Sequence, residues 1–210
     1  MNYRNIIFDL DGTLIDSSDG VVEAVNYSLS EMGDQTRSPD EIKKFIGYPL
    51  SQMYPLFSDN PIKELYSHFQ EKAKSTIVST TNSLPGVESV LDYLIENNYK
   101  LSIASTKIRI HIDGIIEKLN WNKYFDIWCG GDEVSKVKPD PEIFLLTLDK
   151  MNANKDDTIV VGDTVNDIYA AQKCDLKVVA VSSPYGGDQI LKDAEPDYFI
   201  ESLEQLNNIV

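Results

Sequence analysis

Short runs of apolar residues, many of them β-branched, recur along the chain, and polar or turn-forming residues bound each run. The runs are Asn5–Phe8, Leu101–Ala104, Ile127–Cys129, Thr158–Val161 and Val178–Val181. Continuous apolar runs of this length are typical of strands that are buried on both faces of a parallel sheet. We therefore expect these segments to form a mostly parallel sheet.

Between the later runs, apolar residues recur at the spacing of a helix. One set comprises Val87, Val90, Leu91, Leu94 and Ile95, and another comprises Ile143, Phe144, Thr147, Leu148 and Met151. Strands that alternate with helices predict a doubly wound α/β fold with a Rossmann-like sheet.

The segment between the first two runs breaks this rhythm, because it is far longer than the dozen or so residues that a parallel crossover requires. The additional residues have the apolar spacing of three helices. The first covers Val21–Met32 and ends at Gly33, the second begins at Ser38 and ends near Gly47, and the third covers Ile62–Ile77. We expect an α/β core formed by residues 1–15 and 83–210, with a helical insertion at residues 16–82.

The charge balance of the chain limits the classes of partner that we expect it to bind. Of 210 residues, 42% are hydrophobic and 25% are charged, which are ordinary values for a globular protein. The 34 acidic residues outnumber the 19 basic ones and give a net charge of −15. A surface this acidic repels phosphate backbones and anionic lipids, so we expect no nucleic acid and no membrane partner.

Localisation follows from what the sequence lacks. No stretch approaches the ~18 consecutive apolar residues of a membrane span, and the N-terminus does not have the pattern of a signal peptide. Two cysteines, Cys129 and Cys174, are too few for a disulfide framework. We expect a cytoplasmic protein that is a monomer or a weak homodimer.

Neither His68 nor His111 has a partner that the sequence identifies, so we expect both at the surface.

The strongest chemical signal is Asp9-Leu10-Asp11-Gly12-Thr13, which follows the first run directly. Open α/β sheets bind ligands at the carboxyl ends of their strands. Alternation along the strand places Asp9 and Asp11 on one side, and Gly12 lets the backbone turn sharply and approach a ligand. An ordinary Asp-Gly turn is the alternative, but four fixed positions arise by chance in only about one in 10^5 windows at average residue usage.

Two more clusters carry groups that suit a phosphate. Ser105 and Thr106 follow the second run, and a hydroxyl there can donate to a phosphoryl oxygen. Lys138 precedes Pro139, whose fixed φ holds the lysine in place before a helix. The ordinary alternatives are a turn-forming hydroxyl and a solvated surface lysine.

A second pair of carboxylates follows the fourth run. Asp163 ends that run, and Asp167 lies one turn into the next predicted helix, so both can face one point. A helix cap is the alternative for an Asp at this place, and Thr164 could cap the helix equally well.

In this order, the four motifs resemble those of the haloacid dehalogenase-like superfamily, and Phe8–Ser17 resembles its phosphoglycolate phosphatase-like branch. The resemblance covers nearly the whole chain. It implies that residues 16–82 form a helical cap of the C1 type, which can close over the site and exclude water. The stretch Phe45–Leu50 resembles the specificity loop of such caps, where Tyr48 either contacts substrate or packs.

The resemblance also implies a two-step phosphoryl transfer. Asp9 attacks phosphorus and forms an aspartyl-phosphate. Asp11 protonates the leaving alkoxide and then activates the water that hydrolyses the intermediate. Ser105 and Lys138 hold the equatorial oxygens. The remaining substrate contacts implied by the motifs come from Gly12, Thr13 and Thr106, the last by its hydroxyl or its backbone N–H.

The implied cofactor is Mg²⁺. Its ligands would be Asp9, Asp163, Asp11 through the backbone carbonyl, and Asp167 directly or through water, which together match the oxygen preference of the ion. Electrostatics leads to the same expectation, because four neighbouring carboxylates repel one another unless a cation is present.

The leading prediction is a Mg²⁺-dependent phosphatase that acts on a small phosphorylated metabolite, either a phosphoglycolate-like compound or a sugar phosphate. The dehalogenases of the superfamily lack the second Asp, so Asp11 favours phosphoryl transfer. A β-phosphoglucomutase-like mutase shares core and cap but usually has a bulkier residue in place of Thr13. A pyrophosphatase or nucleotidase function is a further alternative, because the substrate specificity of these enzymes lies in the cap. A phospho-aspartate signalling module is the non-enzymatic alternative, although in such modules the phosphorylated Asp follows a middle strand.

Overall fold

The computed structural model describes residues 3–185 and 187–210 and contains a six-stranded parallel sheet. The strand order is β5-β4-β1-β6-β7-β8, and every neighbouring pair is parallel. The strands are β1 Asn5–Phe8, β4 Lys100–Ala104, β5 Phe125–Cys129, β6 Thr158–Gly162, β7 Lys177–Val181 and β8 Tyr198–Ile200. The predicted doubly wound α/β fold is confirmed.

The first strand lies at the centre of the sheet. Phe8 of β1 is aligned with Ile103 of β4 on one side and with Val161 of β6 on the other. From β1 the chain first adds strands on one side of the sheet, β4 and β5, and then on the other, β6 to β8. Open α/β sheets bind ligands where the strand order reverses in this way, in the crevice outside the carboxyl ends of the strands. The segments that follow β1, β4 and β6 therefore meet at one edge of the sheet.

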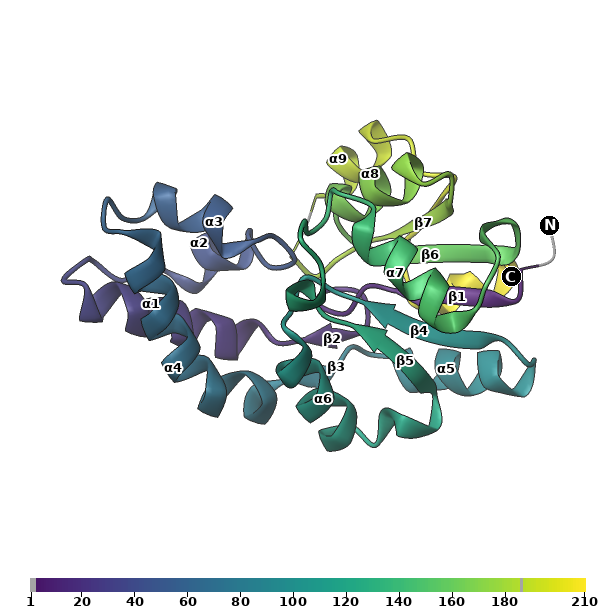
Figure 1. The fold of residues 1–210 in the computed structure, drawn as a ribbon, viewed down its shortest axis with the longest axis horizontal. Helices are drawn as coiled ribbons and strands as arrows, with labels where there is room; N and C mark the ends of the chain where they lie inside the picture. Colours follow the sequence, from purple (N-terminus) through teal and green to yellow (C-terminus); the bar gives the residue numbers. More distant parts are fainter. Residues whose placement is uncertain (1–2, 186) are drawn as a thin grey trace.

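Helices cover both faces of the sheet and form two hydrophobic cores (Figure 1). The helices are α5 Val87–Glu96 and α6 Arg109–Lys118 on one face, and α7 Glu142–Met151, α8 Val165–Lys173 and α9 Asp188–Asp193 on the other. Ile6 and Phe8 belong to the first core and Ile7 to the second, because side chains alternate across a strand. Short 3₁₀ helices complete the core at Trp121–Lys123, Gly131–Glu133, Lys155–Asp157 and Leu203–Asn208.

A group of helices extends from one end of the core, at the left of Figure 1. These helices are α1 Ser18–Glu31, α2 Pro39–Lys43, α3 Leu50–Met53, a 3₁₀ helix at Tyr54–Leu56, and α4 Ile62–Thr80. The two long helices pack along each other, and the buried Ser28 hydroxyl of α1 donates to the Leu65 carbonyl of α4 over 2.6 Å. We call residues 16–82, which contain these helices, the cap segment.

Two connections join the cap segment to the core. Ile15–Asp16 (β2) and Asn82–Ser83 (β3) form an antiparallel pair in which Asp16 is opposite Asn82. These two residues are the predicted limits of the insertion. The pair was not expected, because two residues are too few to show a hydrophobic period.

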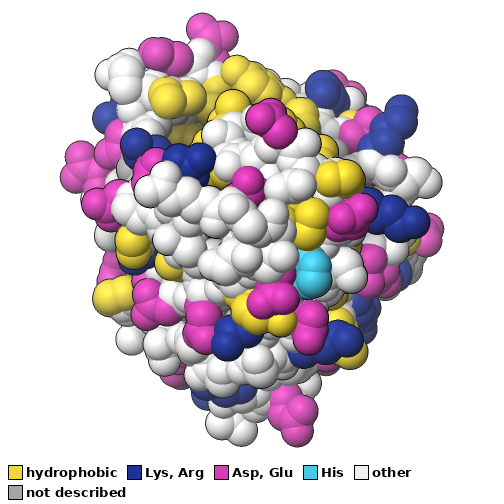
Figure 2. All heavy atoms as spheres, turned by 90° about the vertical axis from the view of Figure 1, so that its left-hand side faces the viewer, with side chains coloured by type: hydrophobic (Ala, Val, Ile, Leu, Met, Phe, Trp, Pro, Cys, Tyr) yellow, Lys and Arg dark blue, Asp and Glu magenta, His cyan; other side chains and the backbone are white. Residues whose placement is uncertain are grey.

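The surface of the cap segment carries mixed charge. Figure 2 shows acidic and basic side chains interspersed on this end of the molecule, with hydrophobic side chains exposed between them. Leu56 and Ile62 are the most exposed of the large hydrophobic side chains of the segment, at 64% and 42%.

Within residues 3–185 and 187–210, no helix is both long enough and apolar enough to span a membrane.

Candidate active site

Lys138 connects two carboxylates in the interior of the protein. Its Nζ lies 2.7 Å from Asp9 Oδ1 and 2.6 Å from Asp167 Oδ1, and it also donates to the Ala104 carbonyl oxygen. Burial of the lysine opposes its charge, but the carboxylates of Asp167 and Asp9 outweigh this effect and raise the pKa of Lys138 to about 12. The side chain is therefore a buried ammonium between two acids.

Asp9, Asp163 and Asp167 form a buried acidic cluster. One carboxylate oxygen of each lies within 4.8 Å of the others. Burial raises the pKa of Asp9 to about 7, while Lys138 opposes the shift and Asp167 adds to it. Burial and the charge of Asp9 likewise raise the pKa of Asp163 well above its ordinary value. Negative charge is thus in excess around Lys138, and three converging hard oxygen ligands fit Mg²⁺.

The two carboxylates that follow β6 are fixed by nearby hydroxyl groups. Thr13 Oγ1 donates to Asp163 Oδ1 over 3.1 Å. Thr164 caps α8, as the sequence suggested, and its N–H and hydroxyl both donate to Asp167 Oδ2. Asp167 therefore accepts from the helix cap with one oxygen and from Lys138 with the other.

Gly12 brings the loop after β1 against Asp163. Its φ is +85°, a conformation that glycine adopts without strain, and a Cβ at this position would collide with the Asp163 carboxylate. The glycine of the Asp-x-Asp-Gly-Thr motif is thus required by the close approach of two active-site segments. The structure records no substrate contact for Gly12 or Thr13, so these roles stay predictions.

Asp11 is held by a second lysine. Lys107 Nζ lies 3.2 Å from Asp11 Oδ2, and 7% and 8% of these side chains are exposed. The Ser17 hydroxyl donates to the other oxygen of Asp11. Ser105 contributes to this arrangement, because its Oγ accepts from the Lys107 backbone N–H over 3.2 Å. Asp9 and Asp11, although close in sequence, are each paired with their own lysine.

Sequence reasoning did not single out Lys107. It follows the predicted Ser105-Thr106 pair directly, and this position just after the end of a strand could have indicated a place in the site. The chain has 19 lysines and arginines, and most such residues lie at the surface. Only the three-dimensional arrangement separates Lys107 from them.

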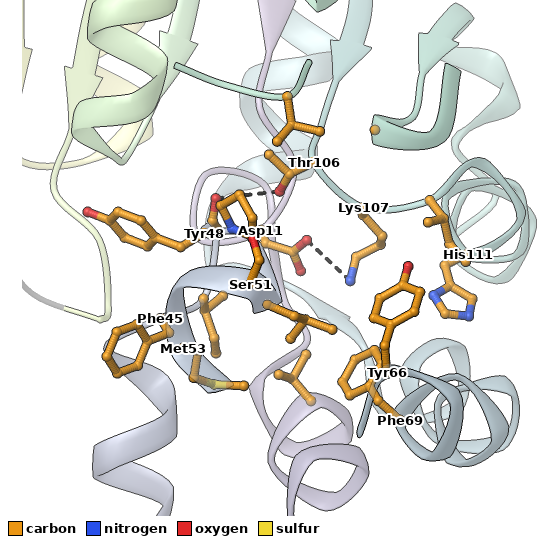
Figure 3. A pocket seen from close by; sticks show the side chains of 18 of the residues that line it. Asp11, Phe45, Tyr48, Ser51, Met53, Tyr66, Phe69, Thr106, Lys107 and His111 are labelled. Atoms are coloured by element: carbon orange, nitrogen blue, oxygen red, sulfur yellow. Dashed lines mark hydrogen bonds and ion pairs between the residues drawn. The ribbon is translucent and has the colours of Figure 1, made fainter. Parts of the chain in front are cut away.

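The loop at residues 45–50 of the cap segment reaches over the core. The Thr106 hydroxyl donates to the Gly47 carbonyl oxygen over 3.4 Å (Figure 3). Tyr48, half-buried, lines two cavities. The predicted substrate-binding residues Thr106 and Tyr48 therefore lie at the boundary between the cap segment and the core.

A cavity of about 340 Å³ lies between the cap segment and the core. Asp11, Thr106 and Lys107 line its core side, and residues of α4 and of the loop at residues 45–50 line the opposite side (Figure 3). A second cavity of about 320 Å³ borders Asp163. Its lining includes Ser183 and Tyr185, which sequence reasoning did not identify.

His111 also lines the first cavity, and its predicted surface position is wrong. Only 7% of the residue is exposed. Burial, together with the neighbouring Lys107, lowers the pKa of His111 to about 4, so the ring is neutral at pH 7. The sequence could not show this, because His111 lies on α6, which packs against the distant helix α4. His68, by contrast, is half-exposed on α4.

Comparisons with known proteins give a consistent result. A family model described as "Haloacid dehalogenase-like hydrolase" matches residues 6–181. "Pyrophosphatase PpaX" of Oceanobacillus iheyensis is 30% identical over 210 residues, which are 100% of this chain and 98% of the relative.

Two solved structures extend the similarity to three dimensions. A "predicted phosphatase" from Clostridium acetobutylicum is 27% identical, covers 99% of this chain and 98% of its own, and gives a TM-score of 0.90. A haloacid dehalogenase-like family hydrolase from Streptococcus pneumoniae is 26% identical, covers 99% of each chain, and gives a TM-score of 0.88.

Proposed function

This chain belongs to the haloacid dehalogenase-like hydrolase family and is a phosphatase, and from this premise we propose that it hydrolyses a small phosphomonoester with Mg²⁺. The nucleophile is Asp9 and the general acid and base is Asp11. The substrate is a small phosphorylated metabolite, and the net charge of −15 argues against nucleic acid or anionic membranes as partners.

One observation supports the proposal most directly. Asp9 is buried, one of its oxygens accepts from Lys138, and a carboxylate oxygen lies within 4.8 Å of ligand atoms of Asp163 and Asp167. Asp11 is directed to a separate cavity, which it shares with Lys107. This arrangement provides a nucleophile near a cationic centre and a distinct acid beside space for a leaving group.

In the first step, a carboxylate oxygen of Asp9 attacks phosphorus and forms the acyl-phosphate bond. The bond from phosphorus to the leaving oxygen breaks, and Asp11 gives its proton to that oxygen. Lys138 stabilises the negative charge on the transferring phosphoryl group. Lys107 and Ser17 fix the orientation of the Asp11 carboxyl group, which borders the cavity.

In the second step, Asp11 removes a proton from water, and the hydroxyl oxygen attacks phosphorus. Inorganic phosphate leaves and the Asp9 carboxylate is regenerated. Asp9 and Asp163, with Asp167 directly or through water, would hold Mg²⁺. When bound, the ion supplies positive charge that offsets the phosphoryl oxygens.

Pyrophosphate hydrolysis is the second candidate. It is favoured by the name of the curated relatives, which are 25–30% identical to this chain and match nearly its full length. Pyrophosphate differs from a phosphomonoester in its leaving group, which is itself a phosphate. The two candidates therefore differ in the charge that the cavity beside Asp11 has to accept.

The test is release of inorganic phosphate from p-nitrophenyl phosphate and from a panel of phosphorylated metabolites, with Mg²⁺ and with EDTA. We expect turnover only with the metal, and none from the Asp9→Asn variant. Asp126→Asn, which changes an exposed carboxylate, is the matched control and should retain full activity. Absence of metal-dependent phosphate release from every compound would overturn the proposal.

A further inference from the structure

The cavity beside Asp11 is lined mainly by hydrophobic side chains of the cap segment. It extends from Asp11 and Lys107 towards α4 and the loop at residues 45–50 (Figure 3). The lining on this side includes Phe45, Leu50, Met53, Ile62, Tyr66 and Phe69. Because Asp11 borders the cavity, the space lies where the leaving group of a substrate would be.

Aromatic rings form part of the wall. Tyr66 and Phe69 are stacked, with centroids 6.4 Å apart and planes inclined by 16°. Figure 3 shows both on the same side of the cavity as His111. Aromatic side chains in a cavity wall can pack against a planar guest in an offset or edge-to-face arrangement.

The lining provides little positive charge for an anion. Among the described residues that line the cavity, the charged ones are Asp11, Asp132 and Lys107. The Lys107 ammonium is already shared between Asp11 and Ser17. His111 is neutral because of its burial. A second phosphate or a carboxylate here would lose its hydration without gaining a free cation.

On the basis of the proposed phosphatase function, we propose that the substrate is a phosphomonoester whose leaving group carries an uncharged aromatic ring, which binds in this cavity. A cavity of about 150 Å³ can hold benzene, so the 340 Å³ available here can accommodate two fused rings. Pyrophosphate and phosphoglycolate, whose leaving groups carry charge, would be poor substrates.

The experiment compares primary alkyl phosphates whose leaving alcohols have similar acidity, so that chemistry and binding are not confused. Methyl, benzyl and 2-naphthylmethyl phosphate add one ring at each step. We expect kcat/KM to rise by roughly tenfold with each ring, because each buries apolar surface in the cavity. Pyrophosphate and phosphoglycolate should fall below benzyl phosphate.

A pair of matched variants locates the effect. Tyr66 lines the cavity and Tyr93 on α5 does not, yet both are 36% exposed, so Tyr66→Ser and Tyr93→Ser remove rings of equal exposure from two helices. Tyr66→Ser should lower the ratio of kcat/KM for 2-naphthylmethyl phosphate to that for methyl phosphate by about tenfold. Tyr93→Ser should leave this ratio at the wild-type value.

The outcomes separate this inference from the function on which it rests. A preference for pyrophosphate or phosphoglycolate over 2-naphthylmethyl phosphate would overturn the inference and leave the phosphatase intact. Equal loss of the ratio in the two tyrosine variants would also overturn it. Calorimetry with 2-naphthylmethanol tests the cavity without turnover, and we expect binding to the wild type that Tyr66→Ser weakens. Absence of phosphate release from every compound would overturn the proposed function itself.

Discussion

The Nζ of Lys138 lies 2.7 Å from Oδ1 of Asp9, and only 1% and 5% of these side chains are exposed. The same ammonium lies 2.6 Å from Asp167. A single buried cation thus connects the carboxylate at the end of the first strand with the one in α8. Buried charges of this kind depend on their partners, because an ion left alone in the interior is strongly destabilising.

Replacing Lys138 by Met should affect both activity and stability. Two buried carboxylates lose their cation, so we expect the free energy of unfolding in the absence of Mg²⁺ to fall by about 3–5 kcal/mol. Turnover should fall by at least about 10²–10³, because the cation stabilises charge in the transition state. Urea unfolding and steady-state kinetics measure the two effects. Lys63→Met, at an exposed position of α4, should change neither. A stable and active Lys138→Met protein would contradict this account.

The positions of several site residues could be predicted because they follow the ends of buried strands. Asp9, Ser105 and Asp163 are examples, since a parallel sheet brings all its carboxyl ends to one edge. Lys138 could be identified only by the motif that it matches. The roles of these residues in catalysis stay predictions, whereas the proximity of Asp9, Asp163 and Lys138 is a finding.

Other features depend on contacts between distant segments. The pairing of Lys107 with Asp11 and the burial of His111 both arise where the cap segment meets the core. Neither Lys107 nor His111 belongs to a repeating pattern of apolar residues from which its packing neighbours could be predicted. The short strands β2 and β3 were also missed, because two residues carry no measurable periodicity, and the edge strand β8 was missed as well.

Lys107 should act as a positioning residue for Asp11. Lys107→Met removes the charged partner that orients the carboxyl group, and we expect kcat to fall by about 10² with a smaller change in KM. Lys107→Arg keeps the charge and should restore part of the loss. Steady-state kinetics on benzyl phosphate, whose alkoxide leaving group needs the proton of Asp11, measure the split between kcat and KM. A loss confined to KM would show that Lys107 binds substrate instead.

Thr13 should influence metal binding through Asp163. Its hydroxyl donates to Asp163 Oδ1 over 3.1 Å, so Thr13→Val removes that hydrogen bond while keeping the shape of the side chain. Partners of this kind typically change metal affinity by about 10–100-fold. We therefore expect the Mg²⁺ concentration for half-maximal activity to rise by at least about tenfold. Thr80→Val, which removes a hydroxyl on α4, is the control. An unchanged Mg²⁺ requirement in Thr13→Val would contradict a role of the Thr13 hydroxyl in metal binding through Asp163.

The buried His111 should make stability depend on pH. Burial, then Lys107, lower its pKa from 6.5 to about 4, while Asp11 and Asp132 oppose the shift. Between these two pH values the unfolded chain binds the proton and the folded protein does not, so stability falls as the pH drops through this window.

Urea unfolding at pH 7.5 and pH 5 measures the dependence on His111. We expect the His111→Gln protein to lose less stability between these two pH values than the wild type, whatever its absolute stability. His68→Gln changes the half-exposed histidine of α4 and should lose as much as the wild type. Because carboxylates titrate in all three proteins, the difference between the two variants isolates the buried ring. If His111→Gln and His68→Gln show the same pH dependence, the ring at position 111 is protonated as readily in the folded protein as in the unfolded chain, and its neutral state in the cavity is wrong.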